Sequence, residues 1–154
     1  RRLPPDPKPR LQSAHAAALR EAERRAGGRV LLAGKSLGGR VASHLAAVGH
    51  DALGLVFFGY PLHAPGREER PRSEHFAAIC QPTLFLTGTR DALCDLDVLR
   101  RELPRFGGRT TLEVVEDADH SFAVRKRVTG LGRAEVLDDL IRRVDRWERA
   151  AFPP

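Results

Sequence analysis

Short runs of apolar residues alternate with longer, more polar segments along this chain. Four runs rich in Val, Leu, Phe and Thr have the length and composition of strands buried on both faces of a sheet. They span residues 29–33, 52–58, 82–87 and 110–115. Strands that alternate with helices are typical of parallel sheets with right-handed crossovers. The pattern therefore predicts an α/β fold with a doubly wound, mostly parallel sheet, in a single domain over residues 1–154.

The segments between these runs predict helices and loops. A Pro-rich opening over residues 1–10 predicts extended backbone, and Gly59 to Pro71 predicts a loop. Helices are expected over residues 11–26, 40–48, 73–79 and 96–103 and near the C-terminus. In the last helix, one apolar stripe recurs at the 3.6-residue period and comprises Leu137, Leu140, Ile141, Val144 and Trp147.

The turn after the first apolar run contains the pattern G-x-S-x-G, in Gly34-Lys35-Ser36-Leu37-Gly38-Gly39. Between a strand and a helix, this pattern indicates a nucleophile elbow. The glycines allow strand and helix to approach closely, and the sharp turn forces Ser36 into a strained conformation that exposes its Oγ. The backbone N–H of Leu37 then lies at the start of a helix, where it can stabilise an oxyanion. We therefore expect Ser36 to be a nucleophile and Leu37 an oxyanion donor.

A phosphate-binding loop is the competing interpretation of the same residues. Gly34-Lys35-Ser36 matches the end of the motif G-x-x-x-x-G-K-[ST]. That motif requires glycine at position 29, which is arginine here, and Gly28 lies one residue too early. Residues 30–32 also form an apolar run, whereas a phosphate cradle needs a flexible loop of N–H groups. The sequence favours the elbow.

Two further candidate groups follow later strands. Asp91 ends the segment Gly88-Thr89-Arg90-Asp91, which follows the third apolar run, and His120 lies on the loop after the fourth. Because the carboxyl ends of parallel strands meet at one edge of a sheet, both side chains are expected near Ser36. The chain order Ser, Asp, His is the order that proteins with this elbow use. The sequence thus predicts a triad in which His120 is the base and Asp91 orients it.

Other acids and histidines could compete for these roles. Asp95 and Asp97 are better interpreted as helix caps, and Asp117 and Asp119 as loop carboxylates. Four of the histidines are expected to be surface or helix residues, namely His15, His44, His50 and His75.

Residues near the elbow and in the loop after the second run leave two questions open. His63 either lines a pocket, with Tyr60, or fixes that loop; we predict that both contact the substrate. Lys35 and Arg40 flank the elbow, and they either pair with nearby carboxylates or contact an anionic substrate.

Composition and charge limit the partners and the cellular location that we expect for this chain. The net charge is +6, but the 26 basic residues are scattered among 20 acidic ones, so no nucleic-acid partner is expected. Arg125-Lys126-Arg127 is interpreted as solvated loop. Neither cysteine has a CxxC partner that would indicate a zinc site. No apolar run approaches the ~20 residues of a membrane span. The N-terminal residues also lack the hydrophobic core of a signal peptide. We therefore expect a cytoplasmic protein that does not bind membranes. The absence of methionine suggests a processed chain or a fragment.

Four segments resemble a family of small α/β-hydrolase-like proteins related to dienelactone hydrolases. They are residues 34–40, 59–63, 88–91 and 119–122. This family includes bacterial α/β family hydrolases and the testis-expressed and histone-acetyltransferase-complex homologues of eukaryotes. The resemblance extends over essentially the whole chain and implies the α/β-hydrolase fold, the triad roles given above, and a site without metal or cofactor. It also implies additional N-terminal strands that this chain lacks, which would pack beside residues 29–33 and supply a second oxyanion N–H.

Two functions are consistent with these observations. The first is a serine hydrolase that cleaves a small ester-like or other acyl substrate through an acyl-enzyme. The alternative is a non-catalytic interaction module that keeps the fold. The sequence predicts neither the acyl group nor the oligomeric state.

Overall fold

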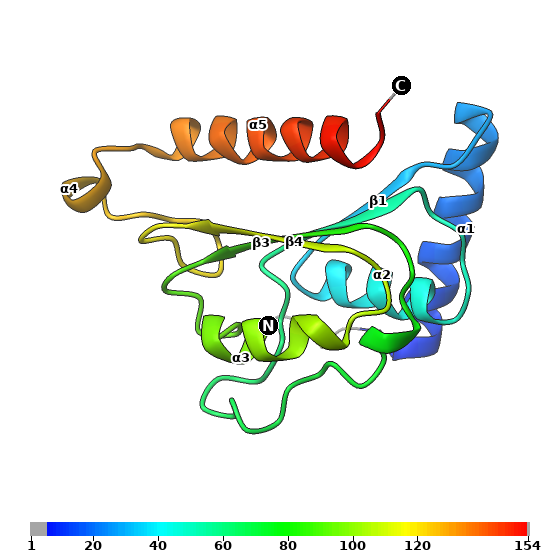
Figure 1. The fold of residues 1–154 in the computed structure, drawn as a ribbon, viewed down its shortest axis with the longest axis horizontal. Helices are drawn as coiled ribbons and strands as arrows, with labels where there is room; N and C mark the ends of the chain where they lie inside the picture. Colours follow the sequence, from blue (N-terminus) through cyan, green and yellow to red (C-terminus); the bar gives the residue numbers. More distant parts are fainter. Residues whose placement is uncertain (1–5, 154) are drawn as a thin grey trace.

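Four parallel strands form the single sheet of the computed structural model, which describes residues 6–153 (Figure 1). The spatial order is β1-β2-β3-β4, the same as the order in the sequence. The strands are β1 (Leu31–Lys35), β2 (Gly54–Phe58), β3 (Thr83–Gly88) and β4 (Thr110–Val115). The predicted parallel α/β sheet is confirmed, and all four strands end at the same edge.

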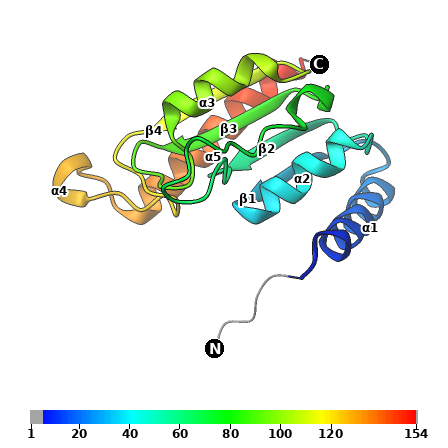
Figure 2. The same cartoon turned by 90° about the horizontal axis from the view of Figure 1, so that it is seen from below.

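Helices cover both faces of this sheet. Figures 1 and 2 show α2 (Leu37–Ala47) and α3 (Leu96–Glu102) on one face and α5 (Arg133–Ala151) on the other. The first helix, α1 (Lys8–Ala26), packs against α2 beyond the β1 edge. Three shorter elements complete the fold, namely the 3₁₀ turns η1 (Phe76–Ala78) and η2 (Leu103–Arg105) and the helix α4 (Lys126–Thr129).

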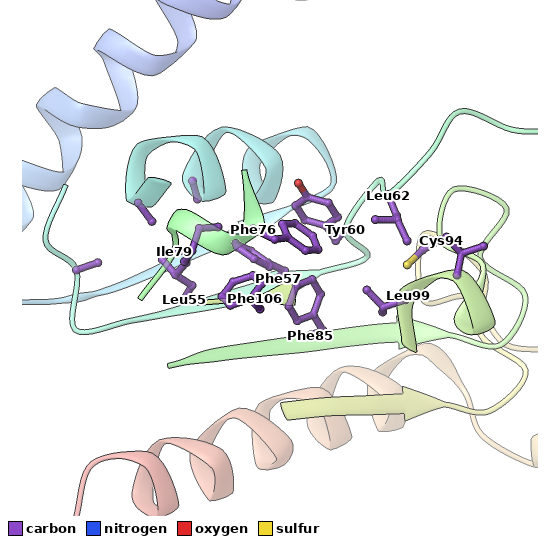
Figure 3. Close-up of a cluster of buried hydrophobic side chains, with 14 residues drawn as sticks. Leu55, Phe57, Tyr60, Leu62, Phe76, Ile79, Phe85, Cys94, Leu99 and Phe106 are labelled. Carbon is purple, nitrogen blue, oxygen red and sulfur yellow. The ribbon is translucent and has the colours of Figure 1, made fainter. Parts of the chain in front are cut away.

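A separate apolar core fills each side of the sheet. Residues of β2 alternate between the two cores, since Leu55 and Phe57 face α2 and α3 while Val56 faces α5. On the first side, Phe57 and Phe85 pack among aromatic rings from the connecting segments (Figure 3). A strand that is buried on both faces of a sheet has a continuous run of apolar residues. This is why the positions of β2 and β3 could be predicted from the sequence.

Several element boundaries differ from the predictions. Residues 8–10 are helical rather than extended, because proline is tolerated in the first turn of α1; residues 1–5 of the predicted extended segment lie outside the described residues. The first strand begins at Leu31 rather than Arg29 and continues to Lys35. The helix expected over 73–79 is only the 3₁₀ turn η1, which suits the burial of Phe76 and Ile79 at a three-residue spacing.

The buried face of α5 is rotated from the predicted stripe. Val136, Leu140 and Trp147 are the buried residues of this helix, whereas Leu137 is 46% exposed and Ile141 is 65% exposed. Leu137 and Ile141 belong to the predicted apolar stripe but not to the buried face, because Val136 begins an alternative stripe with the same spacing. None of the helices within residues 6–153 combines the length and the apolar character needed to cross a membrane.

A polar cluster is buried between α2 and the segment that precedes β3. The Ser43 hydroxyl donates to the Arg40 carbonyl oxygen, and Ser43 Oγ lies 2.7 Å from His75 Nε2 and 3.2 Å from the Tyr60 hydroxyl. The His75 ring stacks on His44, with 3.9 Å between ring centroids. His75 is thus not the surface or helix residue that was predicted.

The stability of the fold is expected to fall as the pH is lowered from about 6.5 towards 3. Burial, followed by the charges of His44, Arg40 and Lys8, lowers the pKa of His75 from 6.5 to about 3. Between pH 6.5 and pH 3, His75 is protonated in the unfolded chain but stays neutral in the folded chain. Lowering the pH through this range therefore favours unfolding. Urea unfolding at pH 7.5 and 4.5 measures this loss, and His75→Gln should make the loss smaller. An equal loss in the variant would contradict the assignment.

Candidate active site

Ser36 occupies the turn between β1 and α2 in a strained backbone conformation. Its φ of 52° and ψ of −121° lie outside the regions that residues with a side chain prefer. The Ser36 N–H donates to the Phe58 carbonyl oxygen, which ties the turn to β2. This geometry agrees with the strained elbow expected from the sequence.

Glycines on both sides of the turn allow strand and helix to touch. A Cβ added at Gly34 would lie 2.7 Å from the Gly38 carbonyl oxygen, and one at Gly39 would lie 2.9 Å from the Gly34 carbonyl oxygen. No side chain fits in either place. The helix therefore begins at Leu37, three residues earlier than predicted, directly after Ser36.

A chain of hydrogen bonds joins three side chains that are distant in sequence. His120 Nε2 lies 2.8 Å from Ser36 Oγ, and His120 Nδ1 lies 2.9 and 3.0 Å from the two carboxylate oxygens of Asp91. Asp91 is 6% exposed, and the other two side chains are partly accessible. When Nδ1–H donates to Asp91, Nε2 of the neutral ring accepts the Ser36 hydroxyl proton, which is the arrangement of a general base beside a nucleophile.

Local contacts hold each loop in this arrangement. The Leu93 N–H donates to Asp91 Oδ1 at 2.9 Å, and Lys35 Nζ donates to the His120 carbonyl oxygen at 3.0 Å. Lys35 thus supports the histidine loop, which neither of its two expected roles included. Asp119 Oδ1 accepts from the N–H groups of Ser121 and Ala123, so this carboxylate shapes the same loop.

Gly59, directly after β2, is a functional position that the sequence analysis missed. Its φ is 61°, and an added Cβ would lie 3.2 Å from the His120 carbonyl oxygen and 3.4 Å from Asp91 Oδ2. The Asp91–His120 pair packs against the bare backbone at this position. The available signal was a glycine directly after an apolar strand, which often marks a close approach of another group.

Asp117 is a second group whose importance the sequence did not show. Expected to be an ordinary loop carboxylate, it is 2% exposed and accepts from the Arg125 N–H at 2.7 Å and from the Arg125 guanidinium. These hydrogen bonds, with the nearby charge of Arg90, lower the pKa of Asp117 to about 2. Arg90 Nε also donates to the Asp117 carbonyl oxygen, and this joins the loop that holds Asp91 to the loop that holds His120.

The predicted substrate contacts of Tyr60 and His63 need correction. Tyr60 is fully buried, and its hydroxyl lies 3.3 Å from the Arg72 carbonyl oxygen, in the core shown in Figure 3. His63 is 1% exposed, with Nδ1 3.0 Å from the Ala64 carbonyl oxygen and Nε2 accepting from the Asp95 N–H. Since neither side chain reaches the surface, His63 fixes its loop and Tyr60 belongs to the core.

The remaining predicted residues lie near their expected places. Leu37 is the first residue of α2, where N–H groups have no partner within the helix. Asp95 accepts from the N–H groups of Asp97 and Val98, so its predicted role as a helix cap is confirmed. The prediction that Asp97 also caps this helix was wrong, since Asp97 lies exposed inside the first turn and pairs with Arg100.

Comparison with protein families places this chain among known sequences. The sequence model of the family described as "Alpha/beta hydrolase domain" matches residues 1–149, which is nearly the whole chain. This match agrees with the resemblance noted from the four sequence segments.

Solved structures show the same fold. The Thermus thermophilus protein TT1662 is 30% identical, with a TM-score of 0.56 over 71% of this chain and 54% of its own. A dienelactone hydrolase from Anabaena variabilis is 20% identical, with a TM-score of 0.55 over 84% of this chain and 56% of its own. An alpha-beta serine hydrolase homologue from Coxiella burnetii is 20% identical, with a TM-score of 0.53 over 68% and 47%. The chain therefore spans about half the length of these structures.

Proposed function

This chain belongs to the alpha/beta-hydrolase family, and from that premise we propose that it is a serine hydrolase of small acyl substrates in the dienelactone-hydrolase-like group. The observation that carries the proposal is the unbroken series of hydrogen bonds from Asp91 through His120 to Ser36. A structural role alone does not require a strained serine, a histidine and a buried carboxylate in this order.

In the proposed reaction, Ser36 Oγ attacks the acyl carbonyl carbon while His120 Nε2 takes the hydroxyl proton. The Leu37 N–H donates to the oxyanion of the tetrahedral intermediate. His120 then gives the proton to the leaving alcohol, and an acyl-enzyme remains on Ser36. Water, deprotonated by His120, attacks this ester, releases the carboxylic acid and restores Ser36. Throughout, Asp91 holds the imidazole and stabilises its positive charge.

A fluorophosphonate probe tests this proposal, because it bonds covalently to serines that are activated as nucleophiles. We expect peptide mapping to find the probe on Ser36 and not on Ser121, which is exposed in the loop beside His120. Ser36→Ala should abolish labelling, whereas Ser121→Ala should leave it unchanged. Unlabelled Ser36 in a chain whose circular dichroism shows the native fold would contradict the hydrolase and favour a non-catalytic interaction module.

A further inference from the structure

A groove of about 160 Å³ is lined by residues of α1 and α2 and by Asp6, and Leu37, the proposed oxyanion donor, is one of the lining residues. Its apolar wall consists of Leu11 from α1 and Leu37 and Val41 from α2. The residues from α2 are spaced so that they share one face of the helix. The groove thus includes the residue that follows Ser36 and lies along the helix that the elbow begins.

The polar lining of this groove is mainly basic. Lys8 and Arg40 contribute two positive charges, and within residues 6–153 neither forms an ion pair with a carboxylate. The one acidic residue that lines the groove, Asp6, pairs with Arg10 at 3.1 Å. Within the described residues, no ion pair therefore neutralises these two positive charges.

Two buried nitrogen atoms of the lining also lack a hydrogen-bond partner among the described residues. They are Arg40 Nε and His44 Nε2. Burying a donor without an acceptor costs free energy, and the cost is higher for a charged group. Burial, and then the charges of Lys8 and Arg40, lower the pKa of His44, so both cations are close enough to act on that ring. With Lys8 and Arg40 in its lining and neither in an ion pair within residues 6–153, the groove favours an anion over a cation.

The distance to Ser36 limits the size of the ligand. Arg40 follows Leu37 by three residues, which is about 4.5 Å along a helix that rises 1.5 Å per residue. An acyl chain that starts at the oxyanion position and lies along Leu37 would bring a terminal group to Arg40 after a few methylene groups. The apolar wall would contact those methylenes, and the cations would contact the end of the chain.

We propose that this groove binds the acyl part of the substrate, and that Arg40 and Lys8 bind a carboxylate at its far end. The substrates would then be half-esters of short dicarboxylic acids, with the ester carbonyl at Ser36. The inference rests on the proposed hydrolase function for its substrate class. Binding of an anion in the groove can be measured independently of that function.

Titration with glutarate, followed by amide chemical shifts, tests the groove directly. We expect saturable shifts over residues 37–44 with glutarate and none with its neutral diamide, glutaramide. Arg40→Gln and Lys8→Gln should each weaken binding by about tenfold, the size of a lost charge-assisted contact. The matched controls Arg127→Gln and Lys126→Gln, on the exposed α4, should bind like the unaltered chain. Absence of saturable binding, or equal binding of glutaramide, would overturn the proposal.

Kinetics then separate this inference from the proposed function. The ratio of kcat/KM for 4-nitrophenyl hemiglutarate to that for 4-nitrophenyl butyrate should fall about tenfold in Lys8→Gln, an exposed residue whose replacement leaves the core intact. If Ser36 reacts with the fluorophosphonate but the ratio is unchanged and glutarate does not bind, the groove is wrong and the hydrolase stands. If glutarate binds through Arg40 but Ser36 is unreactive, the hydrolase fails and the groove remains an anion site.

Discussion

Replacement of Asp91 by asparagine is expected to lower the rate of reaction at Ser36 on the order of 10⁴-fold while the fold is preserved. The asparagine Oδ1 can still accept from the Leu93 N–H, so the loop should keep its shape. The amide carries no charge, so the imidazolium that forms during attack loses its stabilising partner. Its NH₂ group can also face His120 Nδ1 and leave the ring in the tautomer that cannot accept the Ser36 proton.

The rates of fluorophosphonate labelling and of ester hydrolysis measure this effect, and urea unfolding shows whether the fold is kept. Asp95→Asn is the matched control, because Asp95 is an exposed helix cap four residues away and asparagine caps helices equally well. Asp91→Asn protein that is stable and still reacts at the original rate would exclude Asp91 from the triad.

Gly34→Ala is expected to lower the free energy of unfolding by about 3 kcal/mol or more. Its methyl group would overlap the backbone of Gly38 and Gly39, and it would lie 2.5 Å from the Gly38 carbonyl carbon. Backbone atoms cannot move aside as a flexible side chain can, so strand and helix must separate, and overpacking of this kind is costly. Because native stabilities are only about 5–15 kcal/mol, this change removes a large part of the total.

Gly38→Ala provides a control in the same turn. A Cβ added at Gly38 meets no atom within 4 Å, and Gly38 lies in the first turn of α2. Alanine there should stabilise the helix by about 0.5–1 kcal/mol. Denaturant unfolding of the two variants gives both values. Equal stability of Gly34→Ala and the unaltered chain would mean that strand and helix are not in contact at the elbow.

The sequence predicted the parallel sheet and the positions of Ser36, Asp91 and His120 well. Strands buried on both faces leave a strong apolar signal, and parallel topology brings the ends of all strands to one edge. Chemical groups directly after three strands therefore had to lie near one another. This inference depends on backbone topology alone and not on the orientation of any loop.

The direction of side chains in the connecting loops was not predictable in the same way. Tyr60 and His63 lie in the loop after β2, as Asp91 lies in the loop after β3. Contacts with Arg72 and Asp95, which are distant in sequence, nevertheless turn the side chains of Tyr60 and His63 into the protein. In the sequence, Asp117 cannot be distinguished from its neighbour Asp119. Only the structure shows that Arg90 and Arg125 both contact Asp117. On α5 two apolar stripes overlapped, and only packing against the sheet selected the one with Val136. Such outcomes depend on long-range contacts that local sequence patterns do not contain.

The arrangement of the strands determines when during folding the proposed site can form. Ser36 and His120 are 84 residues apart in sequence, and they meet only when all four strands have joined one sheet, because β2 and β3 lie between β1 and β4. Contacts between such distant parts of a chain form late and slowly, because a long loop must close first. Ser36 would therefore become reactive only at the end of folding. A pulse of fluorophosphonate during refolding would measure when the last strand arrives.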